Sequence, residues 1–140
     1  MFLNEIIIII YQYCRCVSVE YVSKEWEKQK MIMEKSIQAK LTKGLLDFIV
    51  LQLVNTHSMH GYQIINSIRK NFGVYFGPST IYPLLNTLKK KGFVKSVWDM
   101  NSERSRKIYS LTSDGQDMLD FNEKSLNQIC RKMVAKTRVR

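Results

Sequence analysis

The stretch from Gly77 to Gly92 constrains this chain most, because its pattern is typical of a helix with two dissimilar faces. Apolar residues recur at intervals of three and four, which on a helical period of 3.6 places them in one stripe that must be buried. Pro78 suits the first helical position and Gly92 suits the stop, so both ends of the helix are marked. The buried stripe is predicted to consist of Ile81, Leu84, Leu85 and Leu88.

The opposite face of this helix carries side chains that can donate hydrogen bonds and need no burial. They are Ser79, Tyr82, Asn86, Lys89 and Lys90. Pro83 removes the bond to the carbonyl oxygen of Ser79, which leaves polar groups at the helix start where a phosphate or a base edge could dock. An ordinary amphipathic helix with a solvated lysine face explains the same segment equally well, so the neighbouring elements must decide.

The segments before this helix are also helical in pattern. Ile37–Asn55 is apolar nearly all round, which predicts a helix buried on more than one side. One side would join the core, and the other, with Leu45 and Ile49, would meet a second subunit. Met59–Asn71 has apolar residues at near-helical spacing and predicts a second helix. Helix, turn, helix, turn and a two-faced helix form a helix-turn-helix arrangement whose last helix is exposed.

Two strands are predicted after the two-faced helix. Phe93–Met100 and Lys107–Leu111 are rich in Val, Trp, Ile and Tyr, and the polar segment Asn101–Arg106 separates them. Such a hairpin is called a wing. A basic loop is usually only solvated, but next to a candidate recognition helix it can reach the adjacent backbone or minor groove of a duplex. The basic residues of the wing are Arg104, Arg106 and Lys107.

A final helix is predicted to begin after Thr112, whose side chain suits the N-cap, with Asp114 favourably placed in the first turn. Its apolar stripe has nothing after it in the chain to cover it, so a partner subunit is the simplest cover. The residues of the stripe are Met118, Leu119, Asn122, Leu126, Ile129 and Met133. The predicted fold is mainly α with a small β-hairpin, a winged helix-turn-helix with a C-terminal dimerisation helix.

The length and net charge of the chain limit the number of domains and the kinds of partner that it can have. A chain of 140 residues provides for one compact domain. Four basic and four acidic residues cancel in residues 1–33, so the net charge of +10 falls on residues 34–140. A basic domain favours a polyanion, nucleic acid before a membrane surface. We expect an N-terminal extension over 1–33, a DNA-binding domain over 34–112, and a dimerisation helix with a basic tail over 113–140.

Other classes of site find little support. Cys14, Cys16 and Cys130 are an odd number in distant segments, which fits a reducing cytoplasm better than a disulfide framework. Neither the cysteines nor His57 and His60 have partners at metal-site spacing, so no metal and no cofactor is expected. No nucleophile and base pair or glycine-rich phosphate loop is visible, which argues against an enzyme.

The N-terminal extension contains the run Ile6–Ile10, which is far shorter than the roughly 20 apolar residues of a membrane span. No basic residue precedes the run, which argues against a signal peptide. It is either an extra element that packs on the domain or a dispensable upstream extension, and we favour the second. Met31 and Met33, close to the first domain-like residues, could each be a natural start.

Four blocks of the sequence resemble the PadR family of transcriptional regulators, in the same order and at the same spacing. They are LTKGLLDFIVLQLV, HGYQIINSI, GPSTIYPLLNTLKKKGFV and RKIYSLTSDGQDML, and the resemblance covers about residues 36–120. It implies a dimeric winged helix-turn-helix repressor whose last helix forms the dimer interface. The short C-terminal portion is similar to that of the small members of the family, and the region before Glu34 has no counterpart.

The resemblance also implies roles for individual residues. Ser79, Thr80 and Tyr82 match the start of the DNA-reading helix of the family, and Arg106 and Lys107 match its wing motif. Some small members bind flat aromatic compounds at the dimer interface through a tryptophan of the last helix. Here that helix has only Phe121 as an aromatic residue, so the sequence gives no support for a small-molecule effector.

The leading hypothesis is a sequence-specific DNA-binding dimer that represses transcription from an inverted-repeat operator. Base edges would be contacted by Ser79, Thr80, Tyr82 and Asn86, and of these Asn86 can pair bidentately with adenine. Phosphates would be contacted by Lys89, Lys90, Arg104, Arg106 and Lys107. The alternative is a winged-helix module whose basic face binds an acidic protein, since a fold alone does not settle function.

Overall fold

The structure is a computed structural model and describes residues 19–100 and 105–137. By its contacts the chain divides into two units, Met1–Ala39 and Lys40–Arg140. The second unit contains the predicted winged helix-turn-helix elements together with the final helix. The division of the chain into an extension, a DNA-binding domain and a dimerisation segment stays a prediction about function.

The described part of the first unit belongs to one helix, α2 (Val19–Gly44), which ends in the second unit. Lys30 and Glu34 lie one turn apart on it, with Nζ and Oε1 4.0 Å from each other, an exposed pair of small energetic weight. The run Ile6–Ile10 lies outside the described residues. No helix within the described ranges has the length and apolarity needed to cross a bilayer. The exposed apolar side chains of this part are Trp26, Met31, Ile32, Met33 and Ile37.

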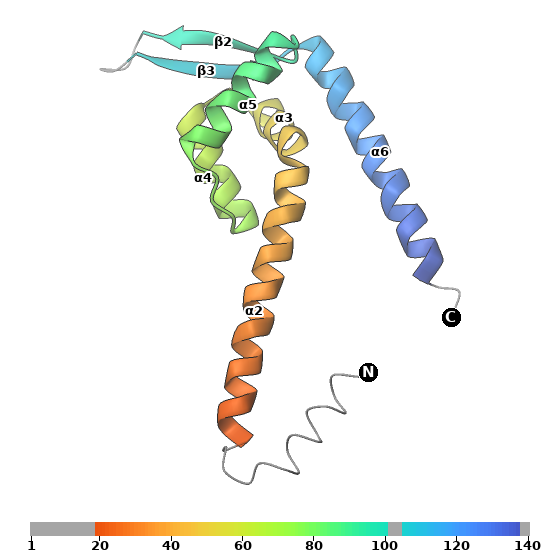
Figure 1. The fold of residues 1–140 in the computed structure, drawn as a ribbon. Helices are drawn as coiled ribbons and strands as arrows, with labels where there is room; N and C mark the ends of the chain where they lie inside the picture. The colour runs from red at the N-terminus through yellow and green to blue at the C-terminus, as the bar shows by residue number, and fades with distance from the viewer. Residues whose placement is uncertain (1–18, 101–104, 138–140) are drawn as a thin grey trace. The chain divides into compact units, whose positions relative to one another are not determined.

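The second unit is mainly helical with a small sheet (Figure 1). After the end of α2 its described elements are α3 (Leu46–Thr56), β1 (Met59–His60), α4 (Gly61–Phe72), α5 (Pro78–Lys90), β2 (Val94–Asp99), β3 (Arg106–Leu111) and α6 (Ser113–Thr137). This order confirms the predicted fold class, a winged helix-turn-helix with a hairpin after the third helix.

The sheet is antiparallel, with the strand order β1-β3-β2. Strands β2 and β3 form the predicted hairpin, with Val94 opposite Leu111 at its base and Asp99 opposite Arg106 near its tip. On the other side of β3, Met59 pairs with Tyr109 and His60 pairs with Ile108. The sequence pattern placed Met59 and His60 in a helix, which is wrong, because their backbones pair with β3 and the helix begins only at Gly61.

The helix predicted over Ile37–Asn55 is divided in the structure. Leu45 separates α2 from α3, although Leu45 N–H still donates to the carbonyl oxygen of Leu41 and Ile49 N–H donates to that of Leu45. The two segments are therefore continuous in hydrogen bonding across the junction. The helix α3 buries residues on several sides, as its apolar pattern predicts.

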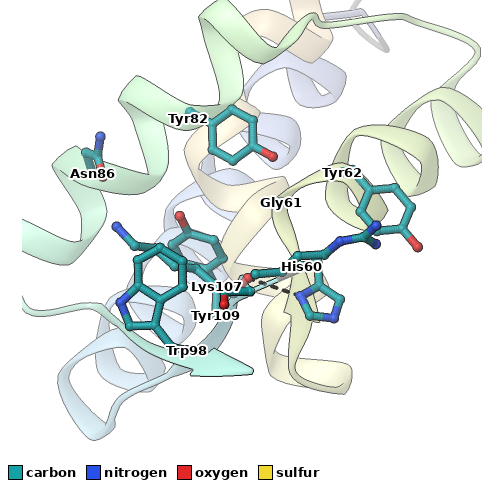
Figure 2. Close-up of a pocket in the computed structure, with 10 residues that line it drawn as sticks. His60, Gly61, Tyr62, Tyr82, Asn86, Trp98, Lys107 and Tyr109 are labelled. Carbon is teal, nitrogen blue, oxygen red and sulfur yellow. Dashed lines mark hydrogen bonds between the residues drawn. The ribbon is translucent and has the colours of Figure 1, made fainter. Parts of the chain in front are cut away.

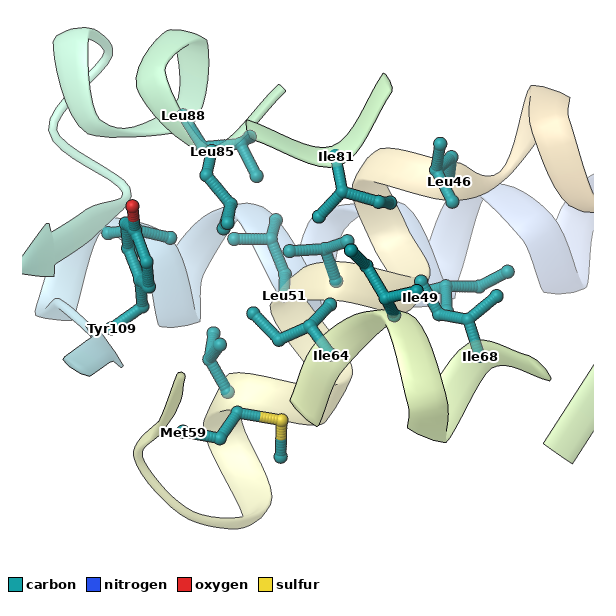
Figure 3. Packing of buried hydrophobic residues seen from close by; sticks show 14 of the residues in the cluster. Leu46, Ile49, Leu51, Met59, Ile64, Ile68, Ile81, Leu85, Leu88 and Tyr109 are labelled. Atoms are coloured by element: carbon teal, nitrogen blue, oxygen red, sulfur yellow. The ribbon is translucent and has the colours of Figure 1, made fainter. Parts of the chain in front are cut away.

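The hydrophobic core lies where α3, α4 and α5 meet, and Figure 3 shows its side chains at close range. Helix α5 contributes Ile81, Leu85 and Leu88, all essentially inaccessible to solvent. Met59 and Tyr109 bring two strands of the sheet into the same cluster. Because each fully buried side chain of this size contributes roughly 2 kcal/mol, the core fixes how α5 sits on the domain.

The ends of the helices follow local signals. The backbone N–H of His60 donates to Oε1 of Gln63 at the start of α4 (2.8 Å), and Gly73 ends α4 in the left-handed conformation. Thr112 caps α6 as predicted, since its Oγ1 accepts a hydrogen bond from Gly115 N–H (3.0 Å). The same Oγ1 donates to the carbonyl oxygen of Gly92 (2.6 Å), which ties the start of α6 to the end of α5.

Candidate nucleic-acid interface

Helix α5 separates its two faces as the sequence predicts. Its apolar stripe is buried at Ile81, Leu85 and Leu88 and half-buried at Leu84. The polar residues Ser79, Tyr82, Asn86, Lys89 and Lys90 are exposed, and Thr80 is half-buried. Gly77 precedes the helix in an extended conformation, and Pro78 occupies its first turn. The structure therefore presents the predicted polar face to solvent, while the contacts of these residues with DNA stay predictions.

Between this face and the wing lies a cavity of about 700 Å³, which we call the α5–wing groove (Figure 2). Several elements supply its walls: the start of α4, the exposed face of α5 and both strands of the wing. The residues that line it are His60, Gly61, Tyr62, Tyr82, Asn86, Trp98, Ser105, Arg106, Lys107 and Tyr109. Four of the predicted DNA-binding residues, Tyr82, Asn86, Arg106 and Lys107, thus share one concave surface.

Both cations of the groove lie over aromatic rings. The guanidinium carbon of Arg106 is 5.3 Å from the centre of the Tyr62 ring, and Nζ of Lys107 is 5.0 Å from the centre of the Trp98 ring. A cation over an aromatic face is attracted by the negative face of the ring, by about 0.5–1 kcal/mol at an exposed site. These contacts limit the rotamers of two flexible side chains without neutralising their charge, so both cations remain available to an anion.

His60 connects the start of α4 to the wing. Its Nδ1 lies 3.2 Å from the carbonyl oxygen of Lys107, and because a carbonyl oxygen only accepts, Nδ1 is the donor in this hydrogen bond. Its Nε2 lies 3.8 Å from Oδ2 of Asp99, and its ring stacks near that of Tyr62 with 6.2 Å between ring centres. These contacts place His60 between α4 and both strands of the wing.

Tyr109 forms the floor of the groove. Its side chain belongs to the core, and burial raises the pKa of its phenol, with the nearby Tyr82 adding to the rise. Tyr109 therefore stays a neutral phenol at physiological pH, so it adds no negative charge to a surface that already carries Arg106 and Lys107. A phosphate would meet no repulsion from this floor.

Comparison with known proteins identifies the family. A model described as the transcriptional regulator PadR-like family matches residues 50–120, which is half of the chain. The chain belongs to the PadR-like family. These proteins are transcriptional regulators and not enzymes, and their function is to bind DNA.

Relatives of this PadR-like chain include a transcriptional activator, GvpE, of Haloferax mediterranei, 31% identical over 98 residues. That match covers 70% of this chain and 46% of the relative, so the chain spans less than half the length of that protein. The crystal structure of a PadR family transcriptional regulator from Eggerthella lenta has a TM-score of 0.66 at 24% identity, covering 85% of this chain and 99% of the other.

A candidate transcriptional regulator from Thermoplasma acidophilum has a TM-score of 0.60 at 30% identity. The match covers 69% of this chain and 93% of that structure. The resemblance drawn from the four sequence blocks is thus confirmed as to family and fold.

Sequence reasoning alone did not single out several residues of the groove in this PadR-like chain. Tyr62, Trp98 and Tyr109 were read only as part of apolar or strand patterns, yet all three line the groove. Tyr62 could have been found from the sequence because it directly follows His60 and Gly61 in one of the four blocks that resemble the family. Arg104, predicted to contact phosphate, lies outside the described residues.

The predicted dimer residues fall into three groups by burial. Ile49 and Leu119 are only 7% and 3% exposed, because they pack in the core of their own subunit. Their assignment to a dimer interface stays a prediction, and their burial leaves little of either side chain for a partner. Met118, Asn122 and Leu126 are half-buried, and Leu45, Ile129 and Met133 are exposed.

A second, smaller cavity of about 330 Å³ lies between the start of α3 and the middle of α6. Leu45, Asn122, Leu126 and Ile129 line part of it. Four predicted dimer residues therefore lie around one hollow, beside the place where α3 and α6 pack together.

Proposed function

We propose that this PadR-like chain is a sequence-specific, double-stranded DNA-binding repressor that acts as a homodimer on an inverted-repeat operator. The observation that carries the proposal is the α5–wing groove, where the polar face of a two-faced helix and the cations of the wing line one concave surface. A helix of this kind enters the major groove, and adjacent cations contact the backbone. The named relative GvpE is an activator, so the direction of regulation needs its own measurement.

Selection of bound duplexes from a random pool, followed by footprinting, tests binding, symmetry and spacing together. We expect an enriched inverted repeat whose half-sites lie about one helical turn apart. Enrichment of a single asymmetric half-site would argue against recognition by a twofold-symmetric dimer. A reporter gene placed behind the selected operator then separates repression from activation.

Two substitutions on α5 should affect DNA binding in different ways. Lys90→Ala should weaken binding to all duplexes alike and reduce the salt slope by about 0.9, the value for one lost phosphate contact. Asn86→Ala should instead change the preference among sites, by roughly 1–3 kcal/mol at one base pair, because an amide can pair bidentately with adenine. Fluorescence anisotropy on selected and random duplexes at several salt concentrations measures both.

The matched control for Lys90→Ala is Lys124→Ala, an exposed lysine of α6 that does not line the groove. It should leave the salt slope unchanged. Unaltered site preference in Asn86→Ala would remove Asn86 from the set of base-reading residues.

The homodimer is proposed to form through the exposed apolar residues of α6. Ile129 and Met133 are 55% and 67% exposed and lie one turn apart on the same helix face. Exposed apolar side chains at this spacing are typical of helix pairing between subunits.

Ile129→Glu together with Met133→Glu should convert the dimer into a monomer, because two carboxylates would be buried unpaired in the interface. Light scattering should show a change from twice the subunit mass of 16.5 kDa to the subunit mass itself. Asn127→Glu, at an exposed polar position of the same helix, is the control and should leave the dimer intact. Identical masses for all three proteins would exclude this helix face as the interface.

A further inference from the structure

Gly61, the first residue of α4, lies against the aromatic ring of Tyr82 from α5 (Figure 2). A Cβ atom built at Gly61 would be 2.6 Å from Cε1 of Tyr82, 3.0 Å from Cζ and 3.1 Å from the hydroxyl oxygen. The first separation is shorter than real Cβ atoms show, and the other two are tighter than most Cβ contacts, so the ring would have to move to admit a methyl group. The ring therefore occupies the space that any other side chain at position 61 would need.

The backbone of Gly61 does not itself require glycine. Positive φ angles occur among the described residues at Gly73 and Gly92, and Gly61 is not one of them. An alanine at position 61 could adopt the same backbone conformation, so the constraint is steric. The constraint acts on Tyr82, a residue 21 positions later in the chain.

Tyr82 combines this close contact with access to the groove. Its side chain is 41% exposed and lines the groove together with Asn86 of the same helix. A free tyrosine on a helix surface samples several rotamers, and fixing one of them before binding lowers the entropy lost when a ligand arrives. The start of α4 holds the ring on one side, and the opposite side remains open to the groove.

We propose that Gly61 is a positioning residue for Tyr82: the missing side chain provides the seat on which the tyrosine ring rests, and the seated ring directs its hydroxyl to DNA in the groove. The inference rests on the proposed function and deepens it, because it names what prepares one of the DNA-contacting side chains. It also explains why a glycine follows His60 in this sequence, although no turn demands one.

A double-mutant cycle on DNA binding tests the coupling. Gly61→Ala should weaken binding to the selected duplex by roughly tenfold, the loss expected for one hydrogen bond to a charged group. Tyr82→Ala should weaken it by a similar factor. Because both changes remove the same contact, the double variant should bind no more weakly than Tyr82→Ala alone. Wild-type affinity in Gly61→Ala, or losses that multiply in the double variant, would overturn the proposal.

Two controls exclude a general loss of structure. Gly44→Ala adds a methyl group where nothing lies within 4 Å and should bind DNA as the wild type does. The double variant restores space for the methyl group, so its thermal unfolding midpoint should match that of Tyr82→Ala. A lower midpoint would mean that Gly61 matters for packing independently of the tyrosine, and would count against the positioning role.

A measurement without DNA separates this inference from the proposed function. In aromatic NMR spectra of the wild-type protein, the ring protons of Tyr82 should show contacts with the Hα protons of Gly61. In Gly61→Ala the Tyr82 signals should shift, while the methyl signals of the buried Ile64 and Ile68 stay in place. Absence of this contact in the wild-type protein would show that the Tyr82 ring does not pack against Gly61. Failure of the wild-type protein to bind any duplex refutes the DNA-binding proposal, and the spectra still decide whether the ring is seated.

Discussion

Leu85→Ala is expected to lower the free energy of unfolding by about 3 kcal/mol, within the range for a fully buried leucine. The Leu85 side chain has no solvent exposure and lies at the centre of the buried stripe of α5. Removing it leaves a cavity directly beneath the exposed face of the same helix. Urea denaturation at one fixed protein concentration measures the loss, since the proposed dimerisation would make stability depend on concentration.

The matched control is Leu84→Ala, which truncates a half-buried leucine one position earlier on the same helix. Its cost should be clearly smaller, because less apolar surface is lost and water can fill the space. Equal costs for both variants would show that α5 does not bury one face as described. DNA affinity of Leu85→Ala, measured at a temperature where the variant is still folded, should also decline, since the exposed face depends on the stripe beneath it.

Gly115→Ala should be similarly destabilising, by about 3 kcal/mol, at the upper end of the usual range for overpacking. Gly115 is buried in the first turn of α6, where a methyl group would collide with the carbonyl oxygen of Phe93 and lie 2.8 Å from Cδ1 of Leu111. That carbonyl oxygen already accepts a hydrogen bond from Thr112 N–H at 3.1 Å, so it cannot move away freely. The expected result is an earlier urea transition.

Gly44→Ala serves as the control for Gly115→Ala. Both glycines lie in helices, but nothing surrounds the position of the added methyl group at Gly44. Alanine favours a helix over glycine by up to about 1 kcal/mol, so this variant should be neutral or slightly more stable. A comparable loss in the two variants would place the cause in the helix backbone rather than in the contact with Phe93.

The elements with strong local signals could be predicted from the sequence. The stripe of α5, the proline at its start and the glycine after its end agree with one another, and each depends on neighbours within a few residues. The cap at Thr112 is of the same kind, because its partner Gly115 is three residues away. Most of the fold class could therefore be predicted from local hydrogen bonds and from the helical period of the apolar residues.

Contacts between distant segments could not be read in this way. Strand β1 has two residues, too few for an alternating pattern, and it exists because Tyr109 and Ile108 pair with it from the far end of the domain. The aromatic lining of the α5–wing groove has the same origin, since Tyr62, Trp98 and Tyr109 come from separate elements. Periodicity assigns a residue to a face, but only packing decides which faces meet.

The dimer prediction shows where pattern and packing diverge. Leu119 and Ile129 lie on the same predicted stripe of α6, yet Leu119 is in the core and Ile129 is exposed. The stripe has a uniform composition, but α3 packs on α6 and covers only part of it. A helix that is longer than the surface it packs on divides its apolar residues between its own subunit and any partner.

The pairing of strand β1 with β3 affects how much conformational freedom the wing loses when it binds a duplex. Strand β1 hydrogen-bonds the side of β3 that faces away from β2, so β3 is paired along both edges at Ile108 and Tyr109. A strand restrained on both edges gives up little freedom when a duplex arrives, and the cost of ordering is smaller than for an isolated hairpin. A change at Met59, in the short strand before α4, should therefore alter how stiffly the wing is held, although Met59 is not among the residues predicted to contact DNA.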